Sequence, residues 1–439
     1  MEIKRSIEII KLIVKNYRGI GPKGVEIDID DIVVLVGPNN SGKSTILRAF
    51  ELVTTADTEI KVDDFYKKIV TNKPEIEIWS KVLDESVNIN RKFWIATGGV
   101  VKEKWIWSAP DTKAERTGYR IDLKRWANST DNPQAPFSND GAATAYRPSP
   151  TYISPFDQPE EQVDAIKKII AIEVYESIKQ EKREDGTYKK LLEGINLLQE
   201  NIRSEAKTKE EAMASELEVI LNELFSGTKI TLDIPSNNPD ILASYAIAKD
   251  IDFKIDNLSL ENQGSGMQRI LLWSVLKMLA GNKKSPSKNK NSLVKKTDVN
   301  NDTPETIRRT KILLMDEPEI CLHPESIRQA KEILYSLASN GEWQIMITTH
   351  SPIFIDLSKD NTNIIRVHKD EGNVSFFKTN EAGLSTNENE QLKMLNIFDP
   401  YFAEFFFAKN VVVVEGDTEY TAFRKIINLN KKSSRMFIL

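Results

Sequence analysis

The stretch Gly37-Pro-Asn-Asn-Ser-Gly-Lys-Ser-Thr45 decides how the rest of the chain is interpreted. It has the spacing of a phosphate-binding loop, in which glycines let backbone N–H groups turn toward phosphate oxygens. Lys43 should reach the β- and γ-phosphates, and Ser44 should ligate Mg²⁺. The residues expected to line a site for ATP and Mg²⁺ are Gly37, Pro38, Asn39, Asn40, Ser41, Gly42, Lys43, Ser44 and Thr45.

The segments on either side of this loop fit that interpretation. Residues 31–36, Asp-Ile-Val-Val-Leu-Val, form a short apolar run typical of a buried strand in a parallel sheet. Residues 44–53 have the apolar spacing of a helix. The order strand, glycine loop, helix is the context that the motif requires. Residues 7–18 and 25–29 predict two further strands.

A second group of functional candidates follows the apolar run at 311–315. Lys311-Ile-Leu-Leu-Met-Asp-Glu-Pro318 predicts a buried strand that delivers Asp316 and Glu317 to its carboxyl end, where open α/β sheets bind ligands. Asp316 would hold Mg²⁺ directly or through water, and Glu317 would orient or deprotonate the attacking water. Capping of the next helix is the alternative role for this acidic pair.

A third apolar strand is predicted in Gln344-Ile-Met-Ile-Thr-Thr-His-Ser351. His350 follows this strand and would sense the γ-phosphate at the same sheet edge; an ordinary loop histidine is the alternative. It is one of only three histidines in the chain.

Two long segments separate these motifs. Residues 55–158 contain short alternating stretches and predict a β-rich insertion, with a loop at 128–150. Its tryptophans are Trp79, Trp94, Trp105, Trp107 and Trp126. Such residues either form a core or, interleaved with basic residues, stack on bases. Residues 159–227 predict a helical arm, which would serve dimerisation or partner binding, or would cap the domain.

Two more segments differ in character from their surroundings. Residues 229–260 return to an alternating pattern and 266–280 predict a strong helix. Residues 281–310 are polar and rich in lysine, so they predict a flexible loop, either a solvated linker or a DNA-contacting segment.

Composition excludes some classes of protein. The chain has 439 residues, a net charge of −5 and a single cysteine, Cys321, so an internal disulfide is impossible and a cysteine-based zinc site is not expected. No run of 18 apolar residues and no apolar secretory leader is present, so we expect a cytoplasmic protein without a membrane partner. The net charge does not favour nucleic acid, but a local basic surface would suffice.

The order of the motifs resembles a known family. The phosphate loop, Gly264-Ser-Gly-Met-Gln268, Met315-Asp-Glu-Pro-Glu319 and Thr348-Thr-His-Ser351 together look like an ABC-type ATPase of the group that includes recombination-repair and OLD (overcoming lysogenization defect) proteins. The opening Val14-Lys-Asn-Tyr-Arg-Gly19 is also similar to that group. The resemblance implies an α/β fold, an ABC-type P-loop NTPase head at 1–54 and 228–400 that carries the β-rich and helical insertions.

That resemblance also implies a shared site. In the family, two heads sandwich two ATPs, and the signature loop of one head contacts the γ-phosphate held by the other. Carried over, Ser265 and Gly266 take the positions of the signature serine and first glycine, and Gln268 takes that of the final glutamine. Met267 replaces the second glycine, and Gly264 stands where leucine is usual. Residues 319–323 fill the D-loop, and no Q-loop glutamine is assigned.

The C-terminus carries a second resemblance. Asn410-Val-Val-Val-Val-Glu-Gly-Asp-Thr-Glu419 looks like the first motif of a Toprim domain, in which Glu415 would bind a metal ion for phosphodiester cleavage. The usual Asp-x-Asp is missing, since no aspartate follows Asp417. We therefore expect residues 401–439 to be the beginning of an incomplete Toprim-like domain and expect no nuclease activity from this chain alone. A truncated domain, a degenerate domain and a chance similarity all remain open.

The leading functional hypothesis is a dimeric or higher even-numbered ATPase that senses or gates nucleic-acid processing, as in the anti-phage defence of OLD-family nucleases. One alternative is an ATP-dependent scaffold that cages a separate effector protein. Another is a repair ATPase similar to RecF or SMC proteins. A transporter is disfavoured because no membrane span is visible.

Overall fold

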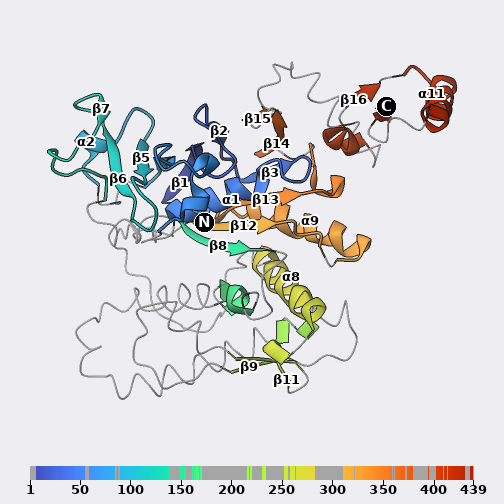
Figure 1. Cartoon of the computed structure of the whole chain (residues 1–439). Helices are drawn as coiled ribbons and strands as arrows, with labels where there is room; N and C mark the ends of the chain where they lie inside the picture. Colours follow the sequence, from blue (N-terminus) through green and yellow to red (C-terminus); the bar gives the residue numbers. More distant parts are fainter. Residues whose placement is uncertain are drawn as a thin grey trace, which may run out of the picture. The chain divides into compact units, whose positions relative to one another are not determined.

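The structure of the chain is a computed structural model. The residues it describes are 6–54, 59–84, 87, 89–137, 148–154, 161, 163–167, 169–170, 215–216, 218–219, 230–233, 252–255, 258–262, 264–281, 310–320, 322–357, 359, 361–370, 373–378, 394, 402–408, 410–412, 414–430 and 436–438. They fall into two compact units (Figure 1). The first comprises Met1–Pro155, Arg309–Lys331 and Gly341–Leu439; the second comprises Phe156–Arg308 and Glu332–Asn340.

A six-stranded sheet of order β15-β14-β3-β13-β12-β8 forms the centre of the first unit. Its strands are β3 (Ile32–Val36), β8 (Ser149–Ile153), β12 (Lys311–Asp316), β13 (Trp343–Thr349), β14 (Thr362–Asp370) and β15 (Asn373–Lys378). All neighbours are parallel except β14 and β15. Every residue of β3, β12 and β13 is buried, which explains their predominantly apolar sequences.

A second sheet of the first unit is antiparallel and has the order β2-β1-β4-β5-β6-β7. Its strands are β1 (Ile7–Lys15), β2 (Val25–Asp28), β4 (Glu75–Val82), β5 (Val100–Ile106), β6 (Glu115–Arg120) and β7 (Arg125–Trp126). Short helical turns accompany it: η1 (Val62–Asp64), η2 (Tyr66–Lys68) and α2 (Arg91–Trp94).

This topology differs from a self-contained insertion at 55–158. Strands β4 to β7 extend the sheet that β1 and β2 begin, whereas β8 joins the parallel sheet. Residue 54 therefore does not mark a boundary between sheets. The reason is that strand pairing is non-local, and the local alternation that predicted strands here carries no information about their partners.

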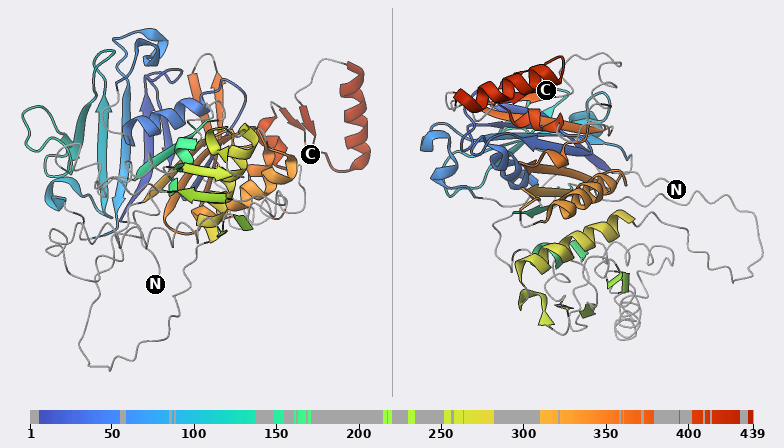
Figure 2. Two further views of the ribbon diagram at one scale, coloured as in Figure 1. Left: turned by 90° about the horizontal axis from the view of Figure 1, so that it is seen from below. Right: turned by 90° about the vertical axis from the view of Figure 1, so that its right-hand side faces the viewer.

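Helix α1 (Lys43–Thr54) joins the two sheets of this unit into one core (Figure 2). It buries an apolar face that includes Ile46, Leu47 and Phe50. The same core cluster holds Leu12 of β1 and Val33 of β3. The glycine loop that precedes α1 is thus anchored between a buried strand and a buried helix.

The tryptophans of the β-rich segment divide into two groups. Trp94, Trp105 and Trp107 are at most 7% exposed and belong to the core. Trp79 and Trp126 are half-buried, and lysine ammonium groups lie over their rings, Lys102 at 3.6 Å and Lys104 at 4.3 Å respectively. Because lysines already cover these faces, the geometry favours packing over base stacking.

The second unit contains a small sheet and a long helix. The sheet has the order β11-β10-β9 and consists of β9 (Ile230–Asp233), β10 (Asp252–Ile255) and β11 (Leu258–Ser259), followed by η3 (Leu260–Asn262). Helix α8 (Ser265–Gly281) is largely buried, and Asn340, beyond the end of α9 (Pro324–Ala338), donates to its Leu279 carbonyl. The helical arm expected at 159–227 and the loop expected at 281–310 lie largely outside the described residues.

The C-terminal segment forms a small βαβ unit. Strands β16 (Asn410–Val412) and β17 (Met436–Ile438) are parallel, and α11 (Asp417–Asn430) connects them. The turns η4 (Pro352–Phe354) and η6 (Phe402–Phe407) come earlier in the chain. Among the described helices, none combines the length and the hydropathy needed to cross a bilayer.

Candidate nucleotide-binding site

The loop between β3 and α1 has a backbone that only glycine accepts at its first position. Gly37 has φ +145°, and a Cβ placed there would lie 2.2 Å from the carbonyl oxygen of Val367 in β14. Gly42 and Asn40 also have positive φ values, +108° and +60°. A chain that turns this sharply presents successive backbone N–H groups to one side, which is how such loops hold phosphate.

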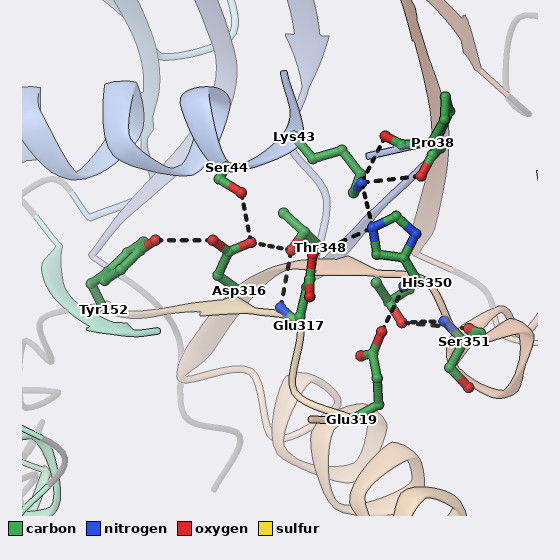
Figure 3. Close-up of polar contacts among 12 residues, drawn as sticks. Pro38, Lys43, Ser44, Tyr152, Asp316, Glu317, Glu319, Thr348, His350 and Ser351 are labelled. Atoms are coloured by element: carbon green, nitrogen blue, oxygen red, sulfur yellow. Dashed lines mark hydrogen bonds and ion pairs between the residues drawn. The ribbon is translucent and has the colours of Figure 1, made fainter. Parts of the chain in front are cut away.

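Lys43, the first residue of α1, points back over this loop (Figure 3). Its Nζ donates to the carbonyl oxygens of Gly37 (3.0 Å) and Pro38 (3.1 Å) and lies 2.9 Å from Nε2 of His350. Burial lowers the pKa of Lys43, while nearby carboxylates, Glu317 first, oppose that shift. The ammonium group is therefore held inside the loop that would surround the phosphates.

Asp316, the last residue of β12, contacts side chains from three other elements (Figure 3). Its Oδ1 accepts from the hydroxyl of Ser44 at 3.0 Å and from that of Thr348. Its Oδ2 accepts from the hydroxyl of Tyr152 in β8 at 3.4 Å. A carboxylate and a serine hydroxyl in direct contact are the oxygen ligands that Mg²⁺ prefers, so the pair fits this ion.

Glu317 follows directly and has a left-handed backbone, with φ +50°. Its N–H lies 3.0 Å from both the carbonyl and the hydroxyl oxygens of Thr348, so β13 fixes this turn. Its Oε1 is 3.3 Å from Nε2 of His350. The conformation turns the carboxylate from the end of β12 toward the neighbouring strand.

His350 completes the cluster at the end of β13. Burial lowers its pKa, and the positive charge of Lys43 adds to that effect. The imidazole is therefore neutral at pH 7, and its contact with Glu317 is not an ion pair there. Because an ammonium group can only donate, Nε2 accepts from Lys43.

The residues that the sequence predicts to contact nucleotide separate into two groups. The phosphate loop, Asp316, Glu317 and His350 come together at the carboxyl ends of β3, β12 and β13. Ser265, Gly266 and Gln268 lie in the second unit at the start of α8, where the Gln268 side chain is buried and donates to Leu260 at 3.1 Å. Their role at the γ-phosphate of a second head stays a prediction.

Glu415 lies in the turn between β16 and α11 and is exposed. No group of three or more metal-ligating side chains occurs within the part of the chain that the structure describes. The role of Glu415 as a metal ligand also stays a prediction.

Tyr152 and Thr348 have no role predicted from the sequence, and Glu319 is predicted only as the first residue of the D-loop. Thr348 and Glu319 belong to the motifs Thr348-Thr-His-Ser351 and Met315-Asp-Glu-Pro-Glu319. The sequence therefore places both residues near the site, but it does not predict their contacts. No sequence pattern marks Tyr152 as a site residue, because it follows a stretch rich in Asn, Pro, Ser and Gly that indicates a loop. Its ring lies 3.9 Å from the Arg48 guanidinium of α1.

A phosphate-binding loop, an acidic pair after β12 and a histidine after the intervening strand β13 define a P-loop NTPase of α/β fold. The family comparison agrees with this class. A model described as "AAA ATPase domain" matches residues 8–139 and 153–355, so the chain belongs to this ATPase domain family. A second model, "Overcoming lysogenization defect protein-like, TOPRIM domain", matches residues 406–437. The resemblance to an OLD-family ATPase followed by the start of a Toprim domain is thereby confirmed.

Curated relatives are similar over most of the chain. The "OLD nuclease" of Thermus scotoductus is 21% identical over 427 residues, which is 95% of this chain and 73% of that protein. The "Old nuclease" of Escherichia phage P2 is 22% identical over 458 residues, covering 99% and 72% respectively. Among solved structures, an Smc head domain from Pyrococcus furiosus, bound to a domain of ScpA, aligns with 16% identity and TM-score 0.49, covering 90% of this chain and all of that one.

Proposed function

We propose that this chain hydrolyses ATP with Mg²⁺ at the site formed by the phosphate loop, Asp316, Glu317 and His350. The observation that carries the proposal is the direct contact of Lys43 with His350 and of Ser44 with Asp316. These contacts join residues about 270 to 310 positions apart in the chain at one sheet edge. Structural packing alone does not require an exposed glycine loop, two carboxylates and a neutral imidazole at one point.

Each residue has a role that its position supports. The N–H groups of the loop and Lys43 would bind the β- and γ-phosphates, and Ser44 and Asp316 would hold Mg²⁺, which neutralises charge on the phosphate oxygens. Glu317 would accept a proton from, or orient, the attacking water. His350, as a neutral imidazole beside Lys43, would sense the γ-phosphate once the triphosphate occupies the loop.

Hydrolysis in this proposal requires two heads. The signature residues Ser265 and Gly266 begin helix α8, whose N-terminus carries the partial positive charge that suits a phosphate. In the second head they would close over the γ-phosphate bound by the first. The rate per chain should therefore rise with chain concentration and level off once all chains are paired.

We further propose that the ATP cycle gates nucleic-acid processing in anti-phage defence. This step is supported by the names of the relatives, both called OLD nucleases, and by the Toprim match at 406–437. DNA binding should weaken steeply with salt if phosphates are contacted. The absence of measurable DNA affinity at low salt would remove this part of the proposal and leave the ATPase part standing.

The test of the ATPase proposal is phosphate release by the purified chain with Mg²⁺ and ATP, measured over a range of chain concentrations. Lys43→Ala is the control that should lose nucleotide binding. A different result would favour the alternative function, an ATP-dependent scaffold that cages a separate effector protein. In that case the wild-type chain would bind ATP and co-purify with another protein, but would show no more turnover than Lys43→Ala. Met267, which replaces a signature glycine, is the residue that motivates this second candidate.

A further inference from the structure

Glu319 joins two parts of the candidate site that are far apart in the sequence. It lies in the turn after β12, two residues beyond Glu317. Its Oε1 accepts a hydrogen bond from the backbone N–H of His350 at 2.6 Å (Figure 3). A charge-assisted N–H···O bond of this length is among the stronger polar contacts in proteins.

The Glu319 carboxyl lies in surroundings that disfavour a polar group, because the described residues around it bury it and leave one of its oxygens without a hydrogen bond. Its Oε2 is buried and has no hydrogen-bond partner in the described residues. Burial raises the pKa of this carboxyl above its usual value, although the hydrogen bond from the His350 N–H opposes that shift. A buried acceptor left unpaired lowers stability, because it loses its hydrogen bonds to water without gaining a replacement. An apolar residue would avoid this cost, so stability alone does not explain the carboxyl.

The contact falls at a point where the regular structure ends. Strand β13 pairs with β3 up to Thr349, and His350 lies just beyond that register. The imidazole of His350 must nevertheless stay within reach of both Lys43 (2.9 Å) and Glu317 (3.3 Å). Within the described chain, the bond to Glu319 is the one that fixes the backbone N–H of this residue.

We infer that Glu319 is a positioning residue for His350. It ties the turn that carries Glu317 to the end of β13, and so holds the imidazole beside Lys43 and Glu317. The role rests on the proposed ATP hydrolysis at this site, whereas the contact itself is a feature of the structure. A shift in the turn after β12 would move His350 with it, which couples this turn to the γ-phosphate position.

The test is a double-mutant cycle between Glu319 and His350, with ATP hydrolysis as the readout. Glu319→Ala should lower kcat about 10- to 100-fold while KM changes less than about threefold, since the residue does not touch the nucleotide. In a His350→Ala background the same substitution should change kcat less than about twofold, because no imidazole is left to position. Glu319→Gln, which keeps an oxygen acceptor, should retain most of the activity.

A matched control distinguishes the positioning of His350 from the general effect of removing an acidic side chain. Glu325 in the first turn of α9 is exposed and pairs with Arg328 on its own helix. Glu325→Ala should leave kcat and KM unchanged. The inference is overturned if Glu319→Ala leaves kcat unchanged, or lowers it equally with and without the imidazole.

An independent readout keeps the inference testable if the chain proves not to hydrolyse ATP. The chain has only three histidines, so ¹⁵N-histidine labelling gives three backbone amide signals. Glu319→Ala should shift the His350 amide proton upfield and raise its exchange rate in nucleotide-free protein, whereas Glu325→Ala should not. An unmoved His350 amide with a native fold contradicts the contact, while absent turnover with a moved amide contradicts only the proposed function.

Discussion

The side-chain amide of Gln344 pairs with both backbone groups of Ile9. Its Nε2 donates to the Ile9 carbonyl at 2.8 Å, and its Oε1 accepts from the Ile9 N–H at 3.0 Å. Both residues are 1% exposed. Gln344 belongs to β13 of the parallel sheet, and Ile9 belongs to β1 of the antiparallel sheet, where a register shift follows it. The pair therefore links the strand that leads to His350 with the neighbouring sheet.

Replacing Gln344 by leucine should destabilise the fold strongly. The substitution leaves a buried N–H and a buried carbonyl unpaired, and each such group costs about 1–3 kcal/mol, so the expected loss is about 2–6 kcal/mol. Urea denaturation measures it through the transition midpoint. The exposed Gln329 on α9 provides the matched control, because Gln329→Leu should change stability by less than about 0.5 kcal/mol. Equal midpoints for Gln344→Leu and wild type would show that the pair contributes nothing.

Thr348→Val should weaken the metal-dependent part of nucleotide binding. The Thr348 hydroxyl donates to Asp316 and accepts from the N–H of Glu317, so its removal frees the carboxylate and the turn together. We expect about a 10-fold increase in the Mg²⁺ concentration needed for half-maximal ATP binding, with little change in metal-free binding. Titration of a fluorescent ATP analogue with Mg²⁺ measures both. Thr112→Val, on an exposed turn, should have no effect, and an identical Mg²⁺ dependence in Thr348→Val would contradict this role.

The neutral state of His350 predicts a particular pH dependence of stability. Its pKa is lowered in the folded chain, so between that value and about 6.5 the unfolded chain binds more protons than the folded one. The free energy of unfolding should therefore fall as the pH drops below about 6.5. Denaturation curves of wild type and of His350→Asn, recorded from pH 8 to pH 5, should show a steeper acid loss in the wild type. A steeper loss of unfolding free energy at acid pH in His350→Asn would mean that folding raises the pKa of His350 instead of lowering it.

Gly37→Ala should disrupt the phosphate loop through the backbone. The added methyl group would meet the Val367 carbonyl oxygen at 2.2 Å, and φ +145° is unfavourable for alanine. We expect loss of ATP binding and a destabilisation of at least about 1–3 kcal/mol. Gly19→Ala is the matched control, because nothing lies within 4 Å of a Cβ at that position. Normal ATP affinity in Gly37→Ala would mean that the loop adopts another conformation when nucleotide binds.

The central strands and the residues at their ends were predictable from the sequence. The runs that became β3, β12 and β13 are mostly apolar because both faces of the sheet are covered. Parallel strands bring their carboxyl ends to one edge, so Lys43, Asp316, Glu317 and His350 were expected to lie close together. The fold class was implied by the resemblance that the phosphate loop and the motifs at the ends of these strands carry.

Contacts that depend on distant pairing were not predictable. Strand β8 begins at Ser149, within a stretch whose composition indicates a loop, and its pairing with β12 brings Tyr152 to Asp316. The bond from His350 to Glu319 spans 31 positions, and no local pattern encodes it. Local periodicity reports which faces are buried, but it does not report which strand lies alongside.

Hydrolysis by Glu317→Gln tests the central claim most directly. The substitution keeps the size and the hydrogen-bonding ability of the side chain but removes the carboxylate that lies 3.3 Å from His350. We predict that ATP affinity stays within about threefold of wild type, while the single-turnover rate of phosphate release falls about 10²- to 10⁴-fold. Unchanged phosphate release by Glu317→Gln, with ATP bound normally, would contradict the proposal that this site hydrolyses ATP through Glu317.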